Sequence, residues 1–305
     1  MYNGYSGMIN IYKEAGFTSH DVVAKLRGIL KQKKIGHTGT LDPAATGVLP
    51  VCLGSGTKLC DMLTEEAKEY RAVLRLGCET DTQDMTGTIL TEKEAAVTEE
   101  QVKEAVLSFV GEYDQIPPMY SAIKVNGKKL YQLAREGKEI ERRPRRVQIH
   151  GIEIESIVLP EVTLRVECSK GTYIRTLCHD IGRKLDCGGT MKELVRIRVG
   201  RFGIEDALRL SEVEKLRDAG KLADKIISVD SIFSEYPKVT VEKQFQKLIE
   251  NGNAFYRNMT LEKEDAVPER QVRVYDVEGR FYGIFELRQE EDRFFPVKMF
   301  RENGY

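Results

Sequence analysis

One carboxylate stands almost alone in a stretch of chain built from glycine, proline and small residues. Between Gly36 and Pro50 the sequence reads GHTGTLDPAATGVLP, and Asp42 is its only acidic residue. Rigid turn residues on both sides suit a loop that presents one reactive oxygen to a ligand. Such a carboxylate can act as a nucleophile or a base toward a sugar or nucleobase carbon. The alternative is structural, because aspartate before proline often caps a turn by accepting backbone N–H bonds.

Arg175 is the candidate cation that would keep such a carboxylate ionised if it were buried. It lies in the first turn of a helix that we expect from Tyr173 to about Leu185. A positive charge in that turn opposes the helix dipole, at a cost of roughly a few tenths of a kcal/mol. The unfavourable position predicts a task elsewhere, such as pairing with a buried carboxylate. The alternative is an ordinary surface arginine.

Two further side chains have shapes that suit contact with an unstacked base. Tyr70 stands near the start of an alternating strand, on the face that also carries Ala72 and Leu74. Its ring is either a core aromatic or a stacking platform, and stacking is worth about 1–3 kcal/mol per base. His37 either wedges into a nucleic acid or bonds within its own glycine-rich turn. As a lone histidine it is a poor metal ligand.

The hydrophobic pattern predicts the elements that position these residues. Strands are expected at 8–12, 70–76, 147–157, 162–169 and 195–199, and helices at 18–30, 98–110, 173–185 and 210–217. After Ile232 the pattern changes to short strands at 237–241, 273–277, 281–287 and 294–300. We therefore expect an α+β domain over residues 1–235 and a small β-rich module over 236–305.

Charge is distributed unevenly in a chain that is nearly neutral overall. The 305 residues are 41% hydrophobic and 31% charged, with a net charge of −1, which argues against nonspecific nucleic-acid binding. The segment from Lys124 to Arg146, however, contains nine basic residues and only three acidic ones. It lies within an insertion at about 116–146 that we expect to be long and exposed. A second basic cluster lies at 25–34. These clusters are either a polyanion footprint or solvated helix faces.

Several classes of site are not indicated. No apolar run approaches the ~20 residues of a membrane span, and residues 1–12 do not resemble a secretory signal. The six cysteines and four histidines are scattered, so reduced thiols are expected and a metal site is not. No phosphate-binding loop is present. The expectation is a cytoplasmic protein.

Four motifs, taken together and in chain order, resemble the bacterial tRNA pseudouridine synthase B (TruB) family. They are the stretch at 36–50, KEYRA at 68–72 with LG at 76–77 and TDTxDxxG at 80–87, QIPPMYSAxK at 115–124 with GKKLY at 127–131, and CSKGTYIRTL at 168–177. Leu194 lies where the family has an apolar residue that packs against the target base. The tail from about Tyr236 is similar to a PUA module. One departure is Lys13-Glu14-Ala15-Gly16, where the family commonly has Lys-Pro before glycine.

The resemblance implies a pseudouridine synthase fold with a mixed, mainly antiparallel sheet, and a reaction. A uridine at position 55, in the T-loop of tRNA, would be flipped out and isomerised to pseudouridine without metal or cofactor. Asp42 would attack or deprotonate the sugar. Arg175 would keep the Asp42 carboxylate ionised, and Tyr70 would stack under the base. His37 and Leu194 would contact the target site. The basic insertion, including Lys124, Lys128 and Lys129, would grip RNA phosphates.

Alternatives remain at this point. One is a synthase that depends on a guide RNA, and another is an RNA-binding or tRNA-folding protein whose catalysis is secondary. The sequence does not decide whether Asp42 attacks C1′, attacks C6 or acts as a base. No membrane and no obligate protein partner is implied beside the tRNA T stem-loop, and a monomer is expected.

Overall fold

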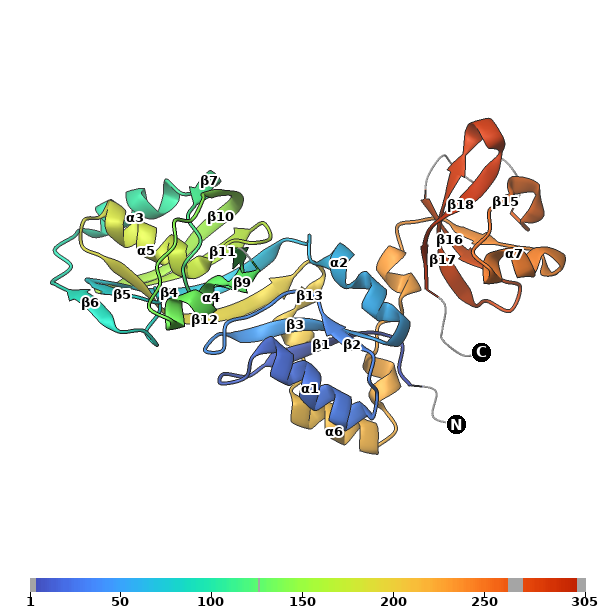
Figure 1. Ribbon diagram of the computed structural model, residues 1–305, viewed down its shortest axis with the longest axis horizontal. Helices are drawn as coiled ribbons and strands as arrows, with labels where there is room; N and C mark the ends of the chain where they lie inside the picture. Colours follow the sequence, from blue (N-terminus) through green and yellow to red (C-terminus); the bar gives the residue numbers. More distant parts are fainter. Residues whose placement is uncertain (1–3, 126, 263–270, 301–305) are drawn as a thin grey trace.

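A computed structural model describes residues 4–125, 127–262 and 271–300, which form two main sheets, each with helices packed on it, and two small two-stranded sheets, β5-β6 and β8-β9 (Figure 1). The strands are β1 Gly7–Lys13, β2 Ile35–His37, β3 Thr46–Leu53, β4 Lys68–Leu76, β5 Cys78–Thr80, β6 Ile89–Glu92, β7 Gly111–Gln115, β8 Lys124–Val125, β9 Lys128–Lys129, β10 Arg145–Val158, β11 Glu161–Cys168, β12 Gly189–Val199, β13 Phe202–Gly203, β14 Lys238–Thr240, β15 Phe255–Tyr256, β16 Gln271–Tyr275, β17 Phe281–Arg288 and β18 Arg293–Met299. The α-helices are α1 Ser19–Leu30, α2 Cys60–Leu63, α3 Glu99–Leu107, α4 Leu130–Arg135, α5 Ile174–Lys184, α6 Leu210–Asp218 and α7 Gln246–Glu250.

The larger sheet has nine strands, in the order β1-β3-β12-β4-β11-β10-β7, with β2 added to β3 and β13 added to β12. Its neighbours pair antiparallel except β3 and β12, which are parallel over two residue pairs. The expected mixed, mainly antiparallel sheet is therefore confirmed. The short parallel contact between β3 and β12 joins the two halves of the sheet, and the Asp42 loop precedes β3 at that joint.

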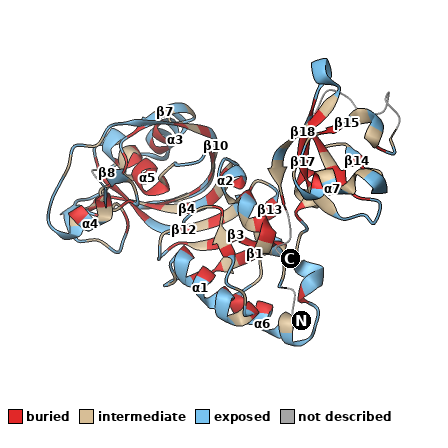
Figure 2. Cartoon of the chain, turned by 45° about the vertical axis from the view of Figure 1, so that its right-hand side comes forward, coloured by how far each residue is buried: buried red, intermediate tan, exposed pale blue. Residues whose placement is uncertain are grey.

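Local sequence signals account for the helices that cover this sheet. Thr18 caps α1 through a capping box with Asp21, as the spacing predicts. The apolar stripe of α1 packs with α6 against β1 and β3, while α3 and α5 pack against β4, β10 and β11. Figure 2 shows these helices with buried sides toward the sheet and exposed sides toward solvent. The helices thus fix the sheet from which the site residues project.

A second sheet of five strands, in the order β14-β16-β17-β18-β15, forms the β-rich tail. It packs against the first through a shared apolar cluster in which Phe233, Ile284 and Phe300 meet Val48 and Leu59. The tail is therefore a docked module. A division of the chain near residue 236 remains our proposal; it falls between β13 and β14.

The stretch from Gly36 to Pro50 is less of a loop than its composition suggests. β2 includes Gly36 and His37, and β3 begins at Thr46, so only residues 38–45 are irregular. Proline is usually excluded from interior strands because it lacks an N–H donor. Pro50 nevertheless lies in β3, where its carbonyl accepts a hydrogen bond from Thr38 N at 3.2 Å.

The strand β12 is also longer than the sequence predicted. It begins at Gly189, six residues before the expected start.

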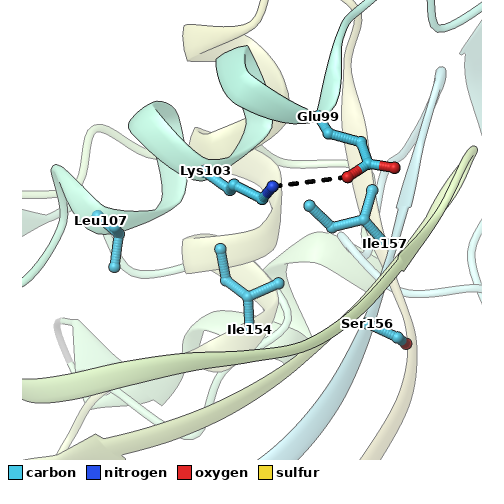
Figure 3. Close-up of a pocket in the computed structure, with 6 residues that line it drawn as sticks. All are labelled: Glu99, Lys103, Leu107, Ile154, Ser156 and Ile157. Carbon is cyan, nitrogen blue, oxygen red and sulfur yellow. Dashed lines mark ion pairs between the residues drawn. The ribbon is translucent and has the colours of Figure 1, made fainter.

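A surface hollow of about 390 Å³ lies between α3 and the end of β10 (Figure 3). Leu107, Ile154 and Ile157 form its apolar lining, and Glu99 pairs with Lys103 at its rim at 3.5 Å. That pair is exposed and spaced i,i+4, an arrangement that contributes only about 0.3–0.5 kcal/mol. The charged groups of the hollow are thus those of an ordinary helix surface.

Replacing Gly47 by alanine tests the joint between β3 and β12. Gly47 has φ +105°, and a Cβ there would lie 2.2 Å from the Arg196 carbonyl oxygen. We expect Gly47→Ala to lower the free energy of unfolding by about 2–5 kcal/mol, because backbone strain adds to a clash with backbone. Gly111→Ala is the matched control, since Gly111 has φ +111° and a Cβ added there would meet no atom within 4 Å. We expect Gly111→Ala to lower the free energy of unfolding by only about 1–2 kcal/mol. Denaturant titration measures this free energy for both variants. Equal decreases in the two variants would contradict this account.

Candidate active site

Hydrogen bonds to neighbouring segments hold the loop that carries Asp42. Leu41 N donates to Ser19 Oγ at 2.9 Å, and the Pro43 carbonyl accepts from Gly16 N at 3.0 Å and from Lys13 Nζ at 3.1 Å. The residues before and after Asp42 are thus fixed from α1 and from the turn that follows β1. The aspartate backbone also takes part in a local turn, because Ala45 N donates to the Asp42 carbonyl at 3.1 Å. The side-chain carboxylate is left for another partner.

That partner is Arg175. Its Nε lies 2.9 Å from Asp42 Oδ2, and its Nη2 donates to Asp42 Oδ1 at 3.3 Å. The arginine side chain is 4% exposed and the aspartate side chain 35% exposed. Arg175 is the second residue of α5, where its charge opposes the helix dipole as the sequence indicated. The structure therefore brings the two residues together in an ion pair with one hydrogen bond, from Nη2, and leaves one side of the carboxylate open.

Arg175 is itself enclosed by further acceptors. Its Nη1 donates to the Thr82 carbonyl at 3.1 Å, and its Nη2 donates to the Tyr120 carbonyl at 3.0 Å. Asp84 Oδ2 lies 3.6 Å from Nη1. A buried guanidinium needs such acceptors because an uncompensated charge in the interior is costly. The guanidinium therefore has one fixed position.

Asp84 is a site residue that sequence reasoning did not single out. It is buried, and its Oδ1 accepts from Thr82 Oγ1 at 2.8 Å and from Thr86 N at 2.9 Å. The signal in the sequence was the pattern TDTxDxxG at 80–87, in which hydroxyl residues alternate with acids. Its pairing with Arg175, ninety-one positions away, could not be read from that pattern.

The electrostatics of Asp42 combine opposing effects. Burial raises the pKa of its carboxyl above the usual value, and the Arg175 charge is the largest effect that lowers it. The negative charge of Asp84 raises this pKa further, and Lys13 lowers it. Lys13 is fully buried, and burial lowers the pKa of its own ammonium to about 8. Two cations, Arg175 and Lys13, thus oppose the effect of burial and favour the carboxylate form of Asp42.

Apolar side chains lie next to this carboxylate. Tyr70 and Leu194 are 8% and 9% exposed and belong to the same cluster as Leu41 and Ala45. A cleft of about 250 Å³ is lined by residues 44–46, 84–86 and 191–195, and so includes Leu194. Burial raises the pKa of the Tyr70 hydroxyl, which therefore stays protonated at neutral pH. Tyr70 and Leu194 are placed beside the loop; a stacking role for either remains a prediction.

The other expected binding residues take no part in the contact between Asp42 and Arg175. His37 ends β2, and its Nδ1 accepts from Gly39 N at 3.3 Å. Burial lowers its pKa, so the ring is neutral near pH 7. Lys124 and Lys129 face each other in the β8–β9 hairpin, where Lys128 pairs with Val125. The segment leading to this hairpin touches the site through the Tyr120 carbonyl.

The arrangement gives an open carboxylate beside a cleft of mixed polar and apolar lining, with a fixed cation behind it. Such a carboxylate can serve as a nucleophile or a base, and the cleft can hold an aromatic ring. Among the described residues no group of three or more histidine, cysteine or acidic side chains is placed to hold a metal ion. Within that same part of the chain, no helix is both long enough and apolar enough to cross a bilayer.

Comparisons with known proteins agree on one family. The model for the N-terminal domain of TruB family pseudouridylate synthases matches residues 27–174, and that for the tRNA pseudouridylate synthase B C-terminal domain matches residues 175–234. A curated relative named tRNA pseudouridine synthase B, from Lachnoclostridium phytofermentans, is 54% identical over 97% of this chain and 99% of its own. Another of that name, from Alkaliphilus oremlandii, is 45% identical over 97% and 98%.

Solved structures show the same fold. The chain is similar to one in a crystal structure of a Cbf5-Nop10-Gar1 complex, with a TM-score of 0.70, 27% identity and coverage of 97% of this chain and 85% of that one. It is also similar to a chain in an H/ACA RNP bound to a substrate RNA containing 2'-deoxyuridine, with a TM-score of 0.69, 25% identity and the same coverage. Both likenesses extend through the C-terminal sheet.

Removing the charge of Asp84 tests the electrostatic account of Asp42. We expect Asp84→Asn to lower the pKa of Asp42, because one of the two influences that raise it is removed. Carbon-13 NMR titration of labelled aspartate carboxyls measures this pKa, and the resonance absent from Asp42→Asn identifies it. Because the folded-state pKa is raised, ionising Asp42 costs folding stability, and this loss grows as pH rises through that pKa. Asp61→Asn, at an exposed position of α2, is the control. An unchanged or higher pKa in Asp84→Asn would contradict the assignment.

Proposed function

Since this chain belongs to the TruB family of pseudouridylate synthases, a family of tRNA-modifying isomerases, we propose that it acts on the T-loop uridine at position 55 with Asp42 as the essential group. The observation that carries the assignment to Asp42 is its contact with Arg175. In the described part of the active site this is the carboxylate that is both fixed by a buried cation and open on one side. Asp84, in contrast, is buried, with its Oδ1 accepting from Thr82 and Thr86 and its Oδ2 at the longer distance of 3.6 Å from Arg175 Nη1.

Isomerisation of uridine breaks the bond between N1 and C1′ and forms a bond between C5 and C1′. The C5 proton is lost and N1 gains one, so the reaction is redox-neutral. A carboxylate can assist by attacking C1′ or C6, or by removing a sugar proton, and all three need the ionised form. Arg175 favours that form, while the open side of Asp42 gives access to the sugar.

The target base must leave its stack before Asp42 can reach it. Extrusion costs a few kcal/mol, which stacking and hydrogen bonds in the enzyme offset. Tyr70 and Leu194 supply apolar surface next to Asp42 for the extruded uracil. His37, neutral and partly buried at the end of β2, has the position and shape to fill the space that the base leaves. The hydroxyl of Tyr70 is the group we propose to assist removal of the C5 proton.

Basic side chains beyond the cleft would hold the RNA. Lys124 and Lys128 are exposed on the β8–β9 hairpin, and Lys129 is half-buried beside the Tyr131 ring. Contacts with phosphates fix register without reading sequence. The C-terminal sheet, which we propose to be a PUA-like RNA-binding module, would extend this surface.

A guide-dependent mode of action is the main competing proposal, because the solved structures above are complexes of several components. Near full-length similarity to relatives named tRNA pseudouridine synthase B, together with the basic hairpin, favours a chain that acts alone. Activity of the pure chain on a T-arm stem-loop without guide RNA would support this. Dependence on added guide RNA would contradict it.

Asp42→Asn is expected to abolish pseudouridine formation while the protein still binds a T-arm stem-loop. The amide keeps the shape and can accept a hydrogen bond from Arg175, but it is neither nucleophile nor base. Release of tritium from C5-labelled uridine measures turnover, and fluorescence anisotropy measures RNA affinity. Full turnover in the purified variant would exclude Asp42 as the essential group. If the variant still fulfilled the protein's role in cells, a tRNA-folding function would be favoured.

Removing the positive charges of the β8–β9 hairpin is expected to lower the affinity for RNA and also to make that affinity less dependent on salt. For the double variant Lys124→Gln/Lys128→Gln, the slope of log K against log salt should become shallower by about 1.4–1.8, because each lost phosphate contact contributes about 0.7–0.9. Single-turnover rates at saturating RNA should change little. Lys215→Gln, on the exposed side of α6, is the control. An unchanged slope would remove the hairpin from the RNA interface.

A further inference from the structure

Arg196 is a buried cation that the proposed reaction does not yet use. It lies in β12, is 1% exposed, and is the largest fully buried side chain of the described residues. In that part of the structure its hydrogen bonds go to backbone carbonyls, and no carboxylate lies within ion-pair distance. Burying a charge without an opposite charge costs several kcal/mol. Packing alone would be served better by an apolar residue, so this arginine needs another explanation.

The guanidinium connects the two ends of the Asp42 loop. Its Nε donates to the Val48 carbonyl at 2.7 Å, and Nη2 and Nη1 lie 3.4 Å and 3.5 Å from the carbonyls of Gly39 and Thr40. Gly39 and Thr40 precede the aspartate, and Val48 follows it in β3. One planar group with donors in a fixed geometry therefore sets the distance between the two ends of the loop. The ammonium of a lysine cannot reproduce that fork.

The same residue lies opposite Tyr70 in the sheet. Arg196 is paired with Tyr70 in the antiparallel ladder of β12 and β4, so the two side chains are cross-strand neighbours. Arg196 thus connects the Asp42 loop to the strand that carries Tyr70.

We propose that Arg196 is a positioning residue that holds the Asp42 loop in register with Tyr70 for the reaction. The proposal rests on the roles proposed above for Asp42 and Tyr70. It predicts that Arg196 acts on the chemical step and leaves RNA binding to other residues. A displacement of about 1 Å between reacting groups can cost about 100-fold in rate.

The electrostatics of Tyr70 are consistent with this geometry. The charged and titratable groups that affect its hydroxyl are Arg196, Cys168 and Asp42. Burial raises the pKa of Tyr70, and the charge of Arg196 is the largest influence that opposes the rise. The arginine therefore lowers the cost of moving a proton from this hydroxyl.

Arg196→Lys and Arg196→Gln test the proposal, with Arg198→Lys and Arg198→Gln as matched controls. Arg198 lies two residues further along the same strand, but it is 44% exposed and pairs with Glu69 at 2.7 Å and Glu167 at 3.1 Å. For each purified variant the measurements are the single-turnover rate on a T-arm stem-loop at saturating RNA, the Kd for that RNA, and the thermal unfolding midpoint. Rates are compared at a temperature at which every variant is folded.

We expect Arg196→Lys to lower the single-turnover rate about 100-fold, with a Kd equal to that of Arg198→Lys. Arg196→Gln should lose at least as much rate, because it also removes the charge. Combined with Tyr70→Phe, Arg196→Lys should cost less than it does alone, since the hydroxyl against which it positions the loop is already absent. Such a split between rate and affinity, with coupling to Tyr70, would not arise from a purely structural role.

Three results would overturn the proposal: equal rates in the Arg196 and Arg198 variants, a loss of affinity equal to the loss of rate, or the absence of coupling to Tyr70. Failure of both Arg196 variants to fold would assign the residue to stability and would also overturn it. The underlying function is tested separately. If Asp42→Asn is inactive while Arg196→Lys is fully active, only this inference fails.

Discussion

The active site depends on one constraint: a carboxylate that burial disfavours needs a cation that cannot move away. Arg175 meets it because its guanidinium is enclosed by Asp42, Asp84 and the carbonyls of Thr82 and Tyr120. These partners come from separate segments, so the ion pair also holds the loops around the cleft together. The unfavourable place of the charge at the start of α5 is offset by this set of acceptors.

The same guanidinium connects the chemical centre to the RNA-binding insertion. The carbonyl of Tyr120 accepts from Arg175, and the chain then runs directly into the basic β8–β9 hairpin. Gln115 ends β7, just before that insertion. Its side chain forms two hydrogen bonds with the backbone of Tyr173, next to the helix that carries Arg175. Residues that we propose to grip RNA are thus attached, through a few hydrogen bonds, to the residues that we propose to react with it.

The sequence was sufficient wherever a local signal existed. Alternation predicted β4 and its buried face, the Thr18 cap predicted the start of α1, and helix position alone marked Arg175 as unusual. Contacts between distant segments gave no such signal. Asp84 and Arg196 matter because of what lies opposite them in space, and β3 was hidden by a glycine and a proline that are tolerated only through their particular neighbours.

Three buried cations explain why the Asp42 loop can be built from such small residues. Lys13 binds the Pro43 carbonyl, Arg196 binds carbonyls at both ends of the loop, and Arg175 binds the carboxylate. The loop is therefore fixed mainly through its backbone oxygens, by donors that belong to other elements. Large side chains are not required to hold it, and they would fill the space that a substrate must enter. A rigid backbone with few side chains is what allows one carboxylate to be both firmly placed and accessible.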